Sequence, residues 1–350
     1  MGRRRRRADE PDRDAILLVD KPVGPTSHDV VQTVRRASGQ SRVGHTGTLD
    51  PAATGVLVVC LGRATKLVRF LQQAGTKTYA ARMVLGVTTD SQDADGEVVA
   101  RQDASHIDER TFCEVLTRFQ GELSQIPPMV SAVKVDGERL HAKARRGEEV
   151  EREARAVTVH ALVLDRFEAV EPAHPEASFL VTCSAGTYVR TLAHDVGEAL
   201  GVGGSLTALR RVANGPFTVE EAHTTEAIRA AAEDGTFDEL VMDPVVALLR
   251  TLPSVEVHDL GLVRRLTQGG GLPAEHLAPV RDAGTDGPVA VRFGDLLVGV
   301  YDGQGATVRP ELVWSQPGDL PAEEPRQHAA GPSDPADLAD PTRAVDPTAP

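Results

Sequence analysis

The stretch GHTGTLDPAATGVL, residues 44–57, contains a single carboxylate, Asp50, among glycine, threonine and small apolar residues. Between Val30 and Thr89 the chain has no other Asp or Glu, although the same window contains eight Lys and Arg residues. A carboxylate in a glycine-rich loop usually caps a helix or closes an Asx turn. In a chain with 51 acidic and 38 basic residues, however, the absence of acid around Asp50 favours a surface that a polyanion can approach.

Length and composition indicate a globular protein of about two domains. The 350 residues are 41% hydrophobic and 25% charged, which is typical of a chain with a large core. The longest apolar run, residues 56–61, is too short to cross a membrane, so we expect no membrane partner. The three cysteines form no Cys-x-x-Cys pair, which argues against a disulfide framework or zinc ribbon and favours a reducing, cytoplasmic location. The basic start, residues 1–13, has no apolar segment and is expected to be a disordered arm.

Charge is unevenly distributed along the chain. The net charge of −13 argues against a simple polyanion binder, but acidic residues gather in segments 90–114 and 220–243, and residues 139–146 contain four basic residues and no acid. Such segregation would let one face bind nucleic acid while the molecule stays acidic overall. Solvated faces without any partner would show the same pattern, so charge alone leaves both interpretations open.

Hydrophobic patterns divide the chain into a large N-terminal part and a small C-terminal unit. Strands are expected at residues 15–19, 78–85, 96–100, 156–170 and 178–184, and amphipathic helices at residues 28–38, 109–120 and 188–199. A boundary is expected at Leu252-Pro253, followed by a helix and alternating strands up to Trp314. The segment 316–350, rich in Pro, Ala and Asp, is expected to be disordered.

Asp50 needs a cation beside it if RNA phosphates are to approach, and Arg190 is the best candidate. The segment SAGTYVRTLAHD, residues 184–195, contains no acid until its end, and Tyr188 and Arg190 lie two residues apart, so both side chains can point into one site. A neighbouring guanidinium would also keep the carboxylate ionised. Tyr79, in the acid-poor window, offers a ring on which an unstacked base can stack, although a core tyrosine is the more common explanation.

Six motifs resemble those of the TruB family of tRNA pseudouridine synthases. They are LLVDKPVGPTSHDVV (17–31), GHTGTLDPAATGVLVVCLGRATKL (44–67), KTYAARMVLGVTTDSQDADG (77–96), QIPPMVSAVKVDGERLHAKARRG (125–147), AGTYVRTLAHDVGEALG (185–201) and LRR (209–211). The resemblance is collinear over residues 16–216, and the unit after Pro253 is similar to the small PUA-type RNA-binding barrel of these enzymes. It implies an α+β catalytic domain with a mixed, largely antiparallel central sheet over residues 14–252. A small PUA-like C-terminal β-barrel is expected over residues 253–315, followed by the acidic tail 316–350.

The resemblance also implies a function, the isomerisation of uridine 55 in the T loop of tRNA to pseudouridine by base flipping, with neither a cofactor nor a metal. The expected partner is therefore the T-arm stem-loop of tRNA, bound by a monomer. Carried over motif by motif, Asp50 is the essential carboxylate, Arg190 is its partner, and Tyr79 is the ring that stacks on the flipped uracil.

Further residues carried over from the family form the pocket, and basic residues form the expected RNA groove. Tyr188 and Leu209 are expected to line the base pocket, His45 to pack into the RNA stack that the base leaves, and Lys21 to support the floor. Leu209 as plain core and Lys21 as a surface charge are equally compatible with the sequence. The expected RNA groove consists of Lys143, Arg145, Arg146, Arg210 and Arg211. His141 departs from the family, which usually has Tyr there, and this puts one RNA contact of that loop in doubt.

Two other functions are open on the residues alone. An RNA-binding or tRNA-folding protein would use the same groove without turnover, but the intact set of Asp50, Tyr79 and Arg190 favours the enzyme. A hydrolase with an Asp nucleophile is disfavoured because no metal-ligand cluster accompanies Asp50. The sequence does not decide whether Asp50 attacks C1′ of the sugar or C6 of the uracil. Because the catalytic set precedes Leu252, the C-terminal unit is expected to add RNA contacts without supplying catalytic groups.

Overall fold

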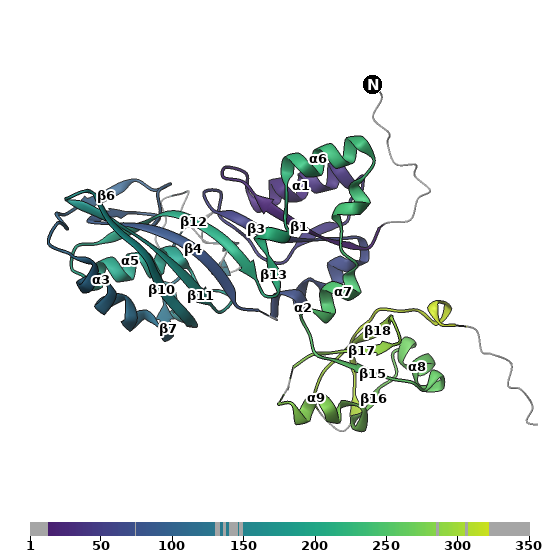
Figure 1. Cartoon of the computed structure of the whole chain (residues 1–350). Coiled ribbons are helices and arrows are strands. Elements are labelled where there is room, and N and C mark those ends of the chain that lie inside the picture. The colour runs from purple at the N-terminus through teal and green to yellow at the C-terminus, as the bar shows by residue number, and fades with distance from the viewer. Residues whose placement is uncertain are drawn as a thin grey trace, which may run out of the picture.

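The computed structural model describes residues 13–73, 75–129, 134–135, 138–139, 146, 150–284, 287–304 and 307–321. These residues form a large unit around one long sheet and a smaller C-terminal unit with a sheet of its own (Figure 1). No helix in the described ranges is long and apolar enough to cross a membrane. The fold is α+β with a large central sheet and a separate small C-terminal sheet, as the sequence predicts.

The central sheet is mixed and largely antiparallel, which confirms the predicted sheet type. Its strands follow the order β14 (His223–Thr224), β1 (Ala15–Lys21), β3 (Thr54–Leu61), β12 (Gly204–Asn214), β4 (Lys77–Leu85), β11 (His174–Cys183), β10 (Arg155–Glu171) and β7 (Gly121–Gln125). Two short strands, β2 (Val43–His45) and β13 (Phe217–Thr218), pair with β3 and β12. The β1–β14 and β3–β12 pairs are parallel, and the other recorded pairs of this sheet are antiparallel.

The two halves of the sheet meet where β3 touches β12. Their pairing is short and joins Thr54 to Arg210 and Gly55 to Arg211, whereas β12 pairs with β4 along nearly its whole length. Gly55 has φ +104°, and a Cβ there would lie 2.2 Å from the carbonyl oxygen of Arg211, so this crossing requires glycine. The loop that contains Asp50 leads directly into β3 and thereby reaches the centre of the sheet.

Helices cover the two halves of the sheet with separate cores. α1 (Ser27–Ser38) and α6 (Thr225–Asp234) lie together over β1 and β3, where they bury Val30, Val34 and Ile228 (Figure 1). A reciprocal capping box between Thr26 and Asp29 begins α1 and satisfies its first amides. On the other half, α3 (Glu109–Leu116) and α5 (Val189–Ala199) pack against β4, β10 and β11.

Smaller elements complete the large unit. They are η1 (Gly62–Leu67), α2 (Val68–Gln73), β5 (Val87–Thr89), β6 (Val98–Arg101), η2 (Thr117–Phe119), β8 (Lys134–Val135), β9 (Glu138–Arg139), η3 (Val219–Glu221), η4 (Phe237–Leu240) and α7 (Pro244–Leu249). The strands predicted at 96–100 and 156–170 are present as β6 and β10. The α-helix predicted at 109–120 ends at Leu116 and continues as the 3-10 turn η2.

The C-terminal unit combines a four-stranded sheet with short helices. The sheet contains β15 (Ser254–Glu256), β17 (Val289–Phe293), β18 (Leu296–Tyr301) and β20 (Pro310–Val313), and β16 (Leu272–Pro273) pairs with β19 (Thr307–Val308). Its helical segments are α8 (Leu260–Thr267), η5 (Ala274–Leu277), α9 (Ala278–Asp282) and η6 (Pro317–Asp319). Tyr301 is fully buried in the core of this unit.

The two units also share part of a hydrophobic core. Trp314 of the C-terminal unit belongs to the same buried cluster as Phe70 on α2. Arg63 lies over the Trp314 ring, 5.1 Å from its centroid, and Arg69 Nη2 lies 3.3 Å from a carboxylate oxygen of Glu311. Apolar packing therefore crosses the boundary that the sequence predicts between the two units.

Candidate active site

A pocket of about 230 Å³ opens where five segments of the large unit meet. Its wall is formed by the Asp50 loop (residues 46–53), the start of β4, the turn that contains Asp93, the start of α5 with the residues before it, and β12. Five of the predicted site residues line this pocket: Asp50, Tyr79, Tyr188, Arg190 and Leu209. The fold therefore brings together residues that lie far apart in the sequence.

Lys21 fixes the Asp50 loop. Its side chain is fully buried at the end of β1. Nζ donates hydrogen bonds to the carbonyl oxygens of Pro22 at 2.9 Å, Pro51 at 3.1 Å and Ala53 at 2.6 Å. Burial lowers the pKa of Lys21 to about 8, and the nearby Asp50 carboxylate opposes this shift. These contacts argue against a surface charge and support a role in holding the loop.

Lys21→Met is expected to loosen this loop and destabilise the fold. The variant leaves three backbone carbonyls without their donor, and loss of the desolvated charge offsets only part of that cost. We expect the unfolding free energy in denaturant to fall by about 1–3 kcal/mol, and turnover to fall with it. Lys66→Met, at an exposed lysine, should change neither quantity. An unchanged unfolding midpoint in Lys21→Met would contradict the anchoring role.

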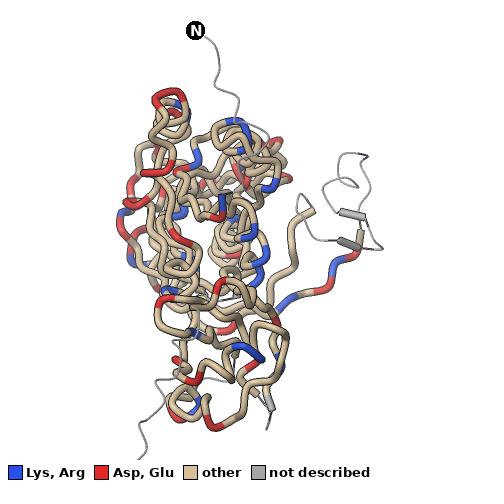
Figure 2. Tube along the Cα trace, turned by 90° about the vertical axis from the view of Figure 1, so that its right-hand side faces the viewer, with Lys and Arg blue, Asp and Glu red and all other residues tan. Residues whose placement is uncertain are grey.

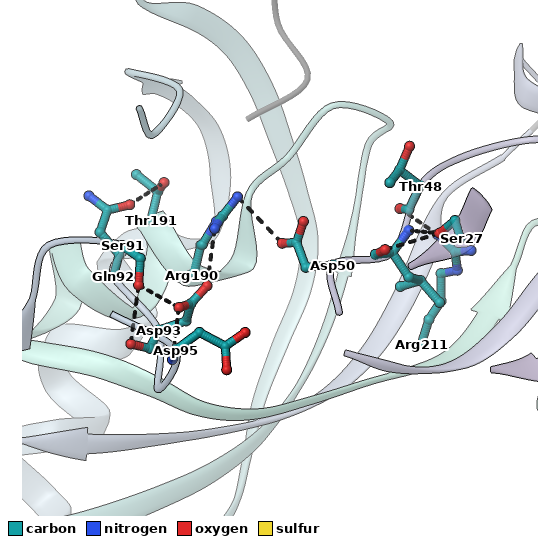
Figure 3. A network of polar contacts seen from close by, with 11 residues as sticks. Ser27, Thr48, Asp50, Ser91, Gln92, Asp93, Asp95, Arg190, Thr191 and Arg211 are labelled. Carbon is teal, nitrogen blue, oxygen red and sulfur yellow. Dashed lines mark hydrogen bonds and ion pairs between the residues drawn. The ribbon is translucent and has the colours of Figure 1, made fainter. Parts of the chain in front are cut away.

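Arg190 bridges two carboxylates in the pocket wall (Figure 3). Its side chain, only 5% exposed, places Nη1 3.0 Å from Asp93 Oδ2 and Nη2 3.4 Å from Asp50 Oδ2. The predicted partner of Asp50 thus lies at ion-pair distance from it. Asp93 is a site residue that the sequence interpretation missed. Its turn, residues 88–96, lies in one of the motifs that resemble the TruB family, but three acids among polar residues are typical of a solvated turn.

The turn that contains Asp93 is held against α5 and β12. Ser91 Oγ donates to Asp93 Oδ1 at 2.5 Å, and Thr191 Oγ1 on α5 donates to the side-chain oxygen of Gln92 at 2.8 Å (Figure 3). The amide of Leu206 on β12 donates to the Gln92 carbonyl at 3.0 Å. Gln92 has φ +66°, an uncommon conformation for a residue with a side chain, and these bonds maintain it. The turn therefore presents its carboxylate in a fixed position.

The Asp50 carboxylate is open to the pocket but poorly hydrated. Its side chain is 45% exposed, yet the surrounding wall removes enough water to raise the pKa of the carboxyl group. Arg190 opposes this shift, and Asp93 adds to it. Together these effects leave a carboxyl group that a ligand can reach and whose pKa lies above the ordinary value for Asp. Such an anion is a suitable nucleophile or base.

Two tyrosines and a leucine give the pocket its apolar wall. Tyr79 on β4 is 7% exposed, and burial raises the pKa of its hydroxyl, so the ring stays neutral. Tyr188 immediately precedes α5, and the side-chain amide of Gln125 binds its backbone N–H at 3.0 Å and its carbonyl at 3.2 Å. Leu209 on β12 packs partly against the core and lines the same pocket. A lining of this kind suits a planar base.

His45 ends β2, next to the Asp50 loop. The amide of Gly47 donates to its Nδ1 at 3.2 Å. Burial lowers the pKa of the imidazole, so the ring is neutral at pH 7 and carries its proton on Nε2. His45 is not part of the pocket wall. Its place beside the pocket, with an uncharged ring, suits stacking against bases.

Arg211 is buried, and its prediction as a groove residue is wrong. The side chain has no exposed surface; Nε donates to the carbonyl of Val56 at 2.8 Å and Nη2 to that of Gly47 at 3.4 Å. Ser27 Oγ accepts from the amide of Leu49 at 2.8 Å and donates to its carbonyl at 3.0 Å. Figure 3 shows both Ser27 and Arg211 at this end of the loop. Arg211 therefore supports the Asp50 loop and offers no surface to RNA.

The other residues predicted for the RNA groove have different positions. Arg210 precedes Arg211 on β12 and faces the other way, with 42% of its side chain exposed. It forms a forked ion pair with Asp20, at 2.8 and 3.0 Å. Arg146 is exposed. Lys143, Arg145 and the unusual His141 lie outside the described residues.

The chemistry that this pocket offers is nucleophilic. Its reactive groups are a partly hydrated carboxylate and a guanidinium that stabilises the anion, beside two aromatic rings. In the described ranges, no three His, Cys, Asp or Glu side chains are grouped so that they could hold a metal ion. The arrangement suits attack by a carboxylate on an electron-poor carbon of a flat ligand.

Comparisons with known proteins identify the family. Residues 35–189 match the N-terminal domain model of TruB family pseudouridylate synthases, and residues 190–256 match the C-terminal domain model of tRNA pseudouridylate synthase B. The chain is 46% identical over 301 residues to tRNA pseudouridine synthase B of Burkholderia mallei (strain NCTC 10247), which covers 86% of this chain and 96% of the relative. It is 43% identical over 289 residues to the protein of the same name from Geobacter sulfurreducens, covering 82% and 91%.

Solved structures agree in fold. The crystal structure of a Cbf5-Nop10-Gar1 complex aligns with a TM-score of 0.66 and 28% identity, over 87% of this chain and 86% of that chain. The structure of an H/ACA RNP bound to a substrate RNA containing 2′-deoxyuridine aligns with a TM-score of 0.63 and 26% identity, over the same shares. Because the family models match consecutive segments and the identity extends over most of both chains, this chain belongs to the TruB family of pseudouridylate synthases.

Proposed function

We propose that the protein converts uridine 55 in the T loop of tRNA to pseudouridine, with Asp50 as the essential carboxylate. Its family is one of pseudouridine synthases, and the relatives named tRNA pseudouridine synthase B support tRNA as the substrate. The observation that carries the proposal is the Asp50 carboxylate, open to a pocket with an aromatic wall and 3.4 Å from a buried guanidinium.

The reaction exchanges one bond between base and sugar for another. The N1–C1′ bond breaks, the uracil turns, and C5 bonds to C1′; C5 then loses a proton and N1 gains one, so no atom or electron is gained overall. Asp50 attacks either C1′ of the sugar or C6 of the uracil, and both routes need an ionised carboxylate. Arg190 orients that carboxylate and favours its charge. Glycosidases use a carboxylate nucleophile in the same way at an anomeric carbon.

The target base has to leave its stack to reach Asp50. Extrusion of a nucleotide costs a few kcal/mol, and stacking on an aromatic side chain returns about 1–3 kcal/mol. We assign this stacking to Tyr79, which is buried in the pocket wall. Tyr188 and Leu209 enclose the base, and the neutral ring of His45 occupies the gap in the RNA stack.

As the pH is lowered, activity is expected to be lost at a higher pH than for an enzyme whose Asp has the ordinary pKa. Burial raises the pKa of the Asp50 carboxyl, so the reactive anion is lost earlier as the pH falls. The value of kcat/KM should therefore rise with pH through that raised pKa and then reach a plateau. Asp93→Asn removes a charge that raises this pKa, so the acid limb should move to lower pH, even where the weaker hold on Arg190 lowers the plateau. An acid limb that stays in place would contradict this coupling.

Incubation with unmodified tRNA, followed by chemical mapping of pseudouridine, tests the proposal. We expect modification at position 55, and none when that tRNA carries cytidine there. An isolated T-arm stem-loop should also be modified. Modification at a different position would overturn the assignment to uridine 55. Tight binding without any pseudouridine would favour the alternative, an RNA-binding or tRNA-folding protein that uses the same groove.

A further inference from the structure

Lys77 is a cation of the pocket to which the mechanism above gives no role. It is the first residue of β4 and lines the pocket two residues before Tyr79. Side chains two positions apart on a strand leave the same face, so the ammonium group and the ring share one wall. Nζ lies close to the Asp50 loop, 3.5 Å from the place that a Cβ on Gly47 would take.

No carboxylate among the described residues pairs with Lys77. The carboxylates of the site are bound elsewhere, since Asp50 and Asp93 contact Arg190. Burial lowers the pKa of Lys77 to about 8, and repulsion by Arg211 adds to the shift. At pH 7 most molecules therefore carry a desolvated ammonium without an anionic partner. A partly buried charge of this kind costs free energy, and such costs are concentrated at functional sites.

The balance of charges around the pocket also indicates that the site lacks an anionic partner. Both signs of charge occur over both units of the protein (Figure 2), so the local balance has to be counted. Four cations, Lys21, Lys77, Arg190 and Arg211, surround two carboxylates, Asp50 and Asp93. The exposed Asp95 compensates at most one of the two excess positive charges. The site lacks an anion, and every nucleotide of RNA brings one as its phosphate.

We propose that Lys77 binds a phosphate that flanks the flipped nucleotide; this inference rests on the proposed function, in which Tyr79 stacks on the base. Same-face neighbours on a strand are roughly 6.5–7 Å apart, a separation that suits a base on one residue and its own backbone on the other. A lysine binds phosphate as a compact point charge. The Asp50 loop beside Lys77 contains no acid other than Asp50, so the loop adds no further repulsion to an approaching phosphate.

Three variants test the contact in turnover. Lys77→Met removes the charge and keeps most of the side-chain volume, Lys77→Arg keeps the charge, and Lys66→Met removes an exposed lysine outside the pocket. A contact made equally in the ground and transition states changes KM and not kcat. We expect Lys77→Met to raise KM for a T-arm stem-loop about tenfold or more, as for a lost charge-assisted hydrogen bond. Lys77→Arg should restore most of the affinity, and Lys66→Met should change KM by less than about threefold.

Stability has to be measured beside turnover. Because Lys77→Met removes a desolvated charge, its thermal unfolding should occur no lower than that of the wild type. If it does unfold more readily, Lys77→Gln replaces it in the same comparison. A kcat that falls with an unchanged KM in the folded variant would overturn the assignment to a phosphate.

Stem-loops with an uncharged methylphosphonate on the 5′ or 3′ side of the target uridine identify the phosphate. Equilibrium binding of these RNAs by wild type and Lys77→Met forms a thermodynamic cycle. At the contacted phosphate, the wild type should lose about as much affinity as Lys77→Met loses on normal RNA, and the variant should lose nothing further. If Lys77→Met and the methylphosphonate lower the affinity independently at both phosphates, so that their factors multiply, the inference is overturned.

Failure of this inference and failure of the proposed function remain distinguishable. Binding is measured separately from pseudouridine formation, and the phosphate is common to substrate and product. If the wild type forms pseudouridine but the two losses of affinity multiply, only the role of Lys77 is rejected. If the two losses are coupled but the protein forms no pseudouridine, the phosphate contact is supported and the proposed reaction is rejected.

Discussion

Asp50→Asn is expected to lower pseudouridine formation on the order of 10³-fold or more while tRNA still binds. The substitution keeps the shape of the side chain and removes the anion that both possible attacks require. Arg190 keeps its contact with Asp93, at 3.0 Å, so the wall of the pocket should retain its form. Single-turnover assays measure the lost reaction, and equilibrium binding measures the retained affinity.

Asp95→Asn is the matched control for this loss. It makes the same chemical change at an exposed carboxylate in the turn that contains Asp93, and surface substitutions of this kind have small effects. We expect its turnover to stay within a few-fold of the wild type. Substantial turnover by purified Asp50→Asn would reject the carboxylate as nucleophile. Loss of binding together with turnover would instead assign Asp50 to the structure of the pocket.

A chain that ends at Arg250 is expected to lose most of its stability. The sequence predicts that such a chain keeps some turnover with weaker RNA binding, because the catalytic set lies before its end. The shared core changes this expectation, since truncation exposes Phe70 and Leu248, which pack in one cluster with Leu297 and Trp314. Burial of each such side chain contributes about 1.5–3 kcal/mol, against a total stability of about 5–15 kcal/mol for a typical domain. Circular dichroism should show melting at a much lower temperature, or aggregation.

Trp314→Ala separates this packing effect from the loss of RNA contacts. Trp314 is 9% exposed and lies beneath the Arg63 guanidinium. Its truncation to Ala should cost about 3–5 kcal/mol, as for a large buried aromatic residue, in a chain that still carries the C-terminal unit. A shortened chain that melts cooperatively at the full-length temperature would mean that the two units fold independently, and would restore the expectation from sequence.

The proximity of Asp50 and Arg190 could be predicted from the sequence because the signals of both residues are local. Asp50 is marked by the lack of acid on both sides of it, and Arg190 by a tyrosine two positions before it. Asp93 has no such mark, because an acid among other acids is typical of a solvated turn. Its role depends on Arg190, Thr191 and Leu206, which reach the turn from distant parts of the chain.

The register of β12 accounts for the wrong assignment of Arg211. Alternate residues on a strand face opposite sides, and a shift of one residue exchanges the buried and exposed sets. From the letters LRR, nothing decides which arginine enters the core. Inside the protein, Arg211 meets backbone carbonyls of the Asp50 loop, whereas Arg210 meets Asp20 at the surface. The shared core of the two units could not be predicted from the sequence either, because an apolar strand does not specify which element covers it.

The Asp50 loop leads into β3, which pairs with β1 in a deeply buried part of the central sheet. β1 and β3 are buried along nearly their whole length, with the α1–α6 core on one side and the shared core on the other. Amide hydrogens in such strands exchange with solvent only when a whole cooperative unit opens, whereas β10, with many exposed residues, can open locally. We therefore expect the Asp50 loop to adjoin a slowly exchanging part of the molecule. We expect adjustment to an entering base to occur mainly in the strands on the other side of the pocket.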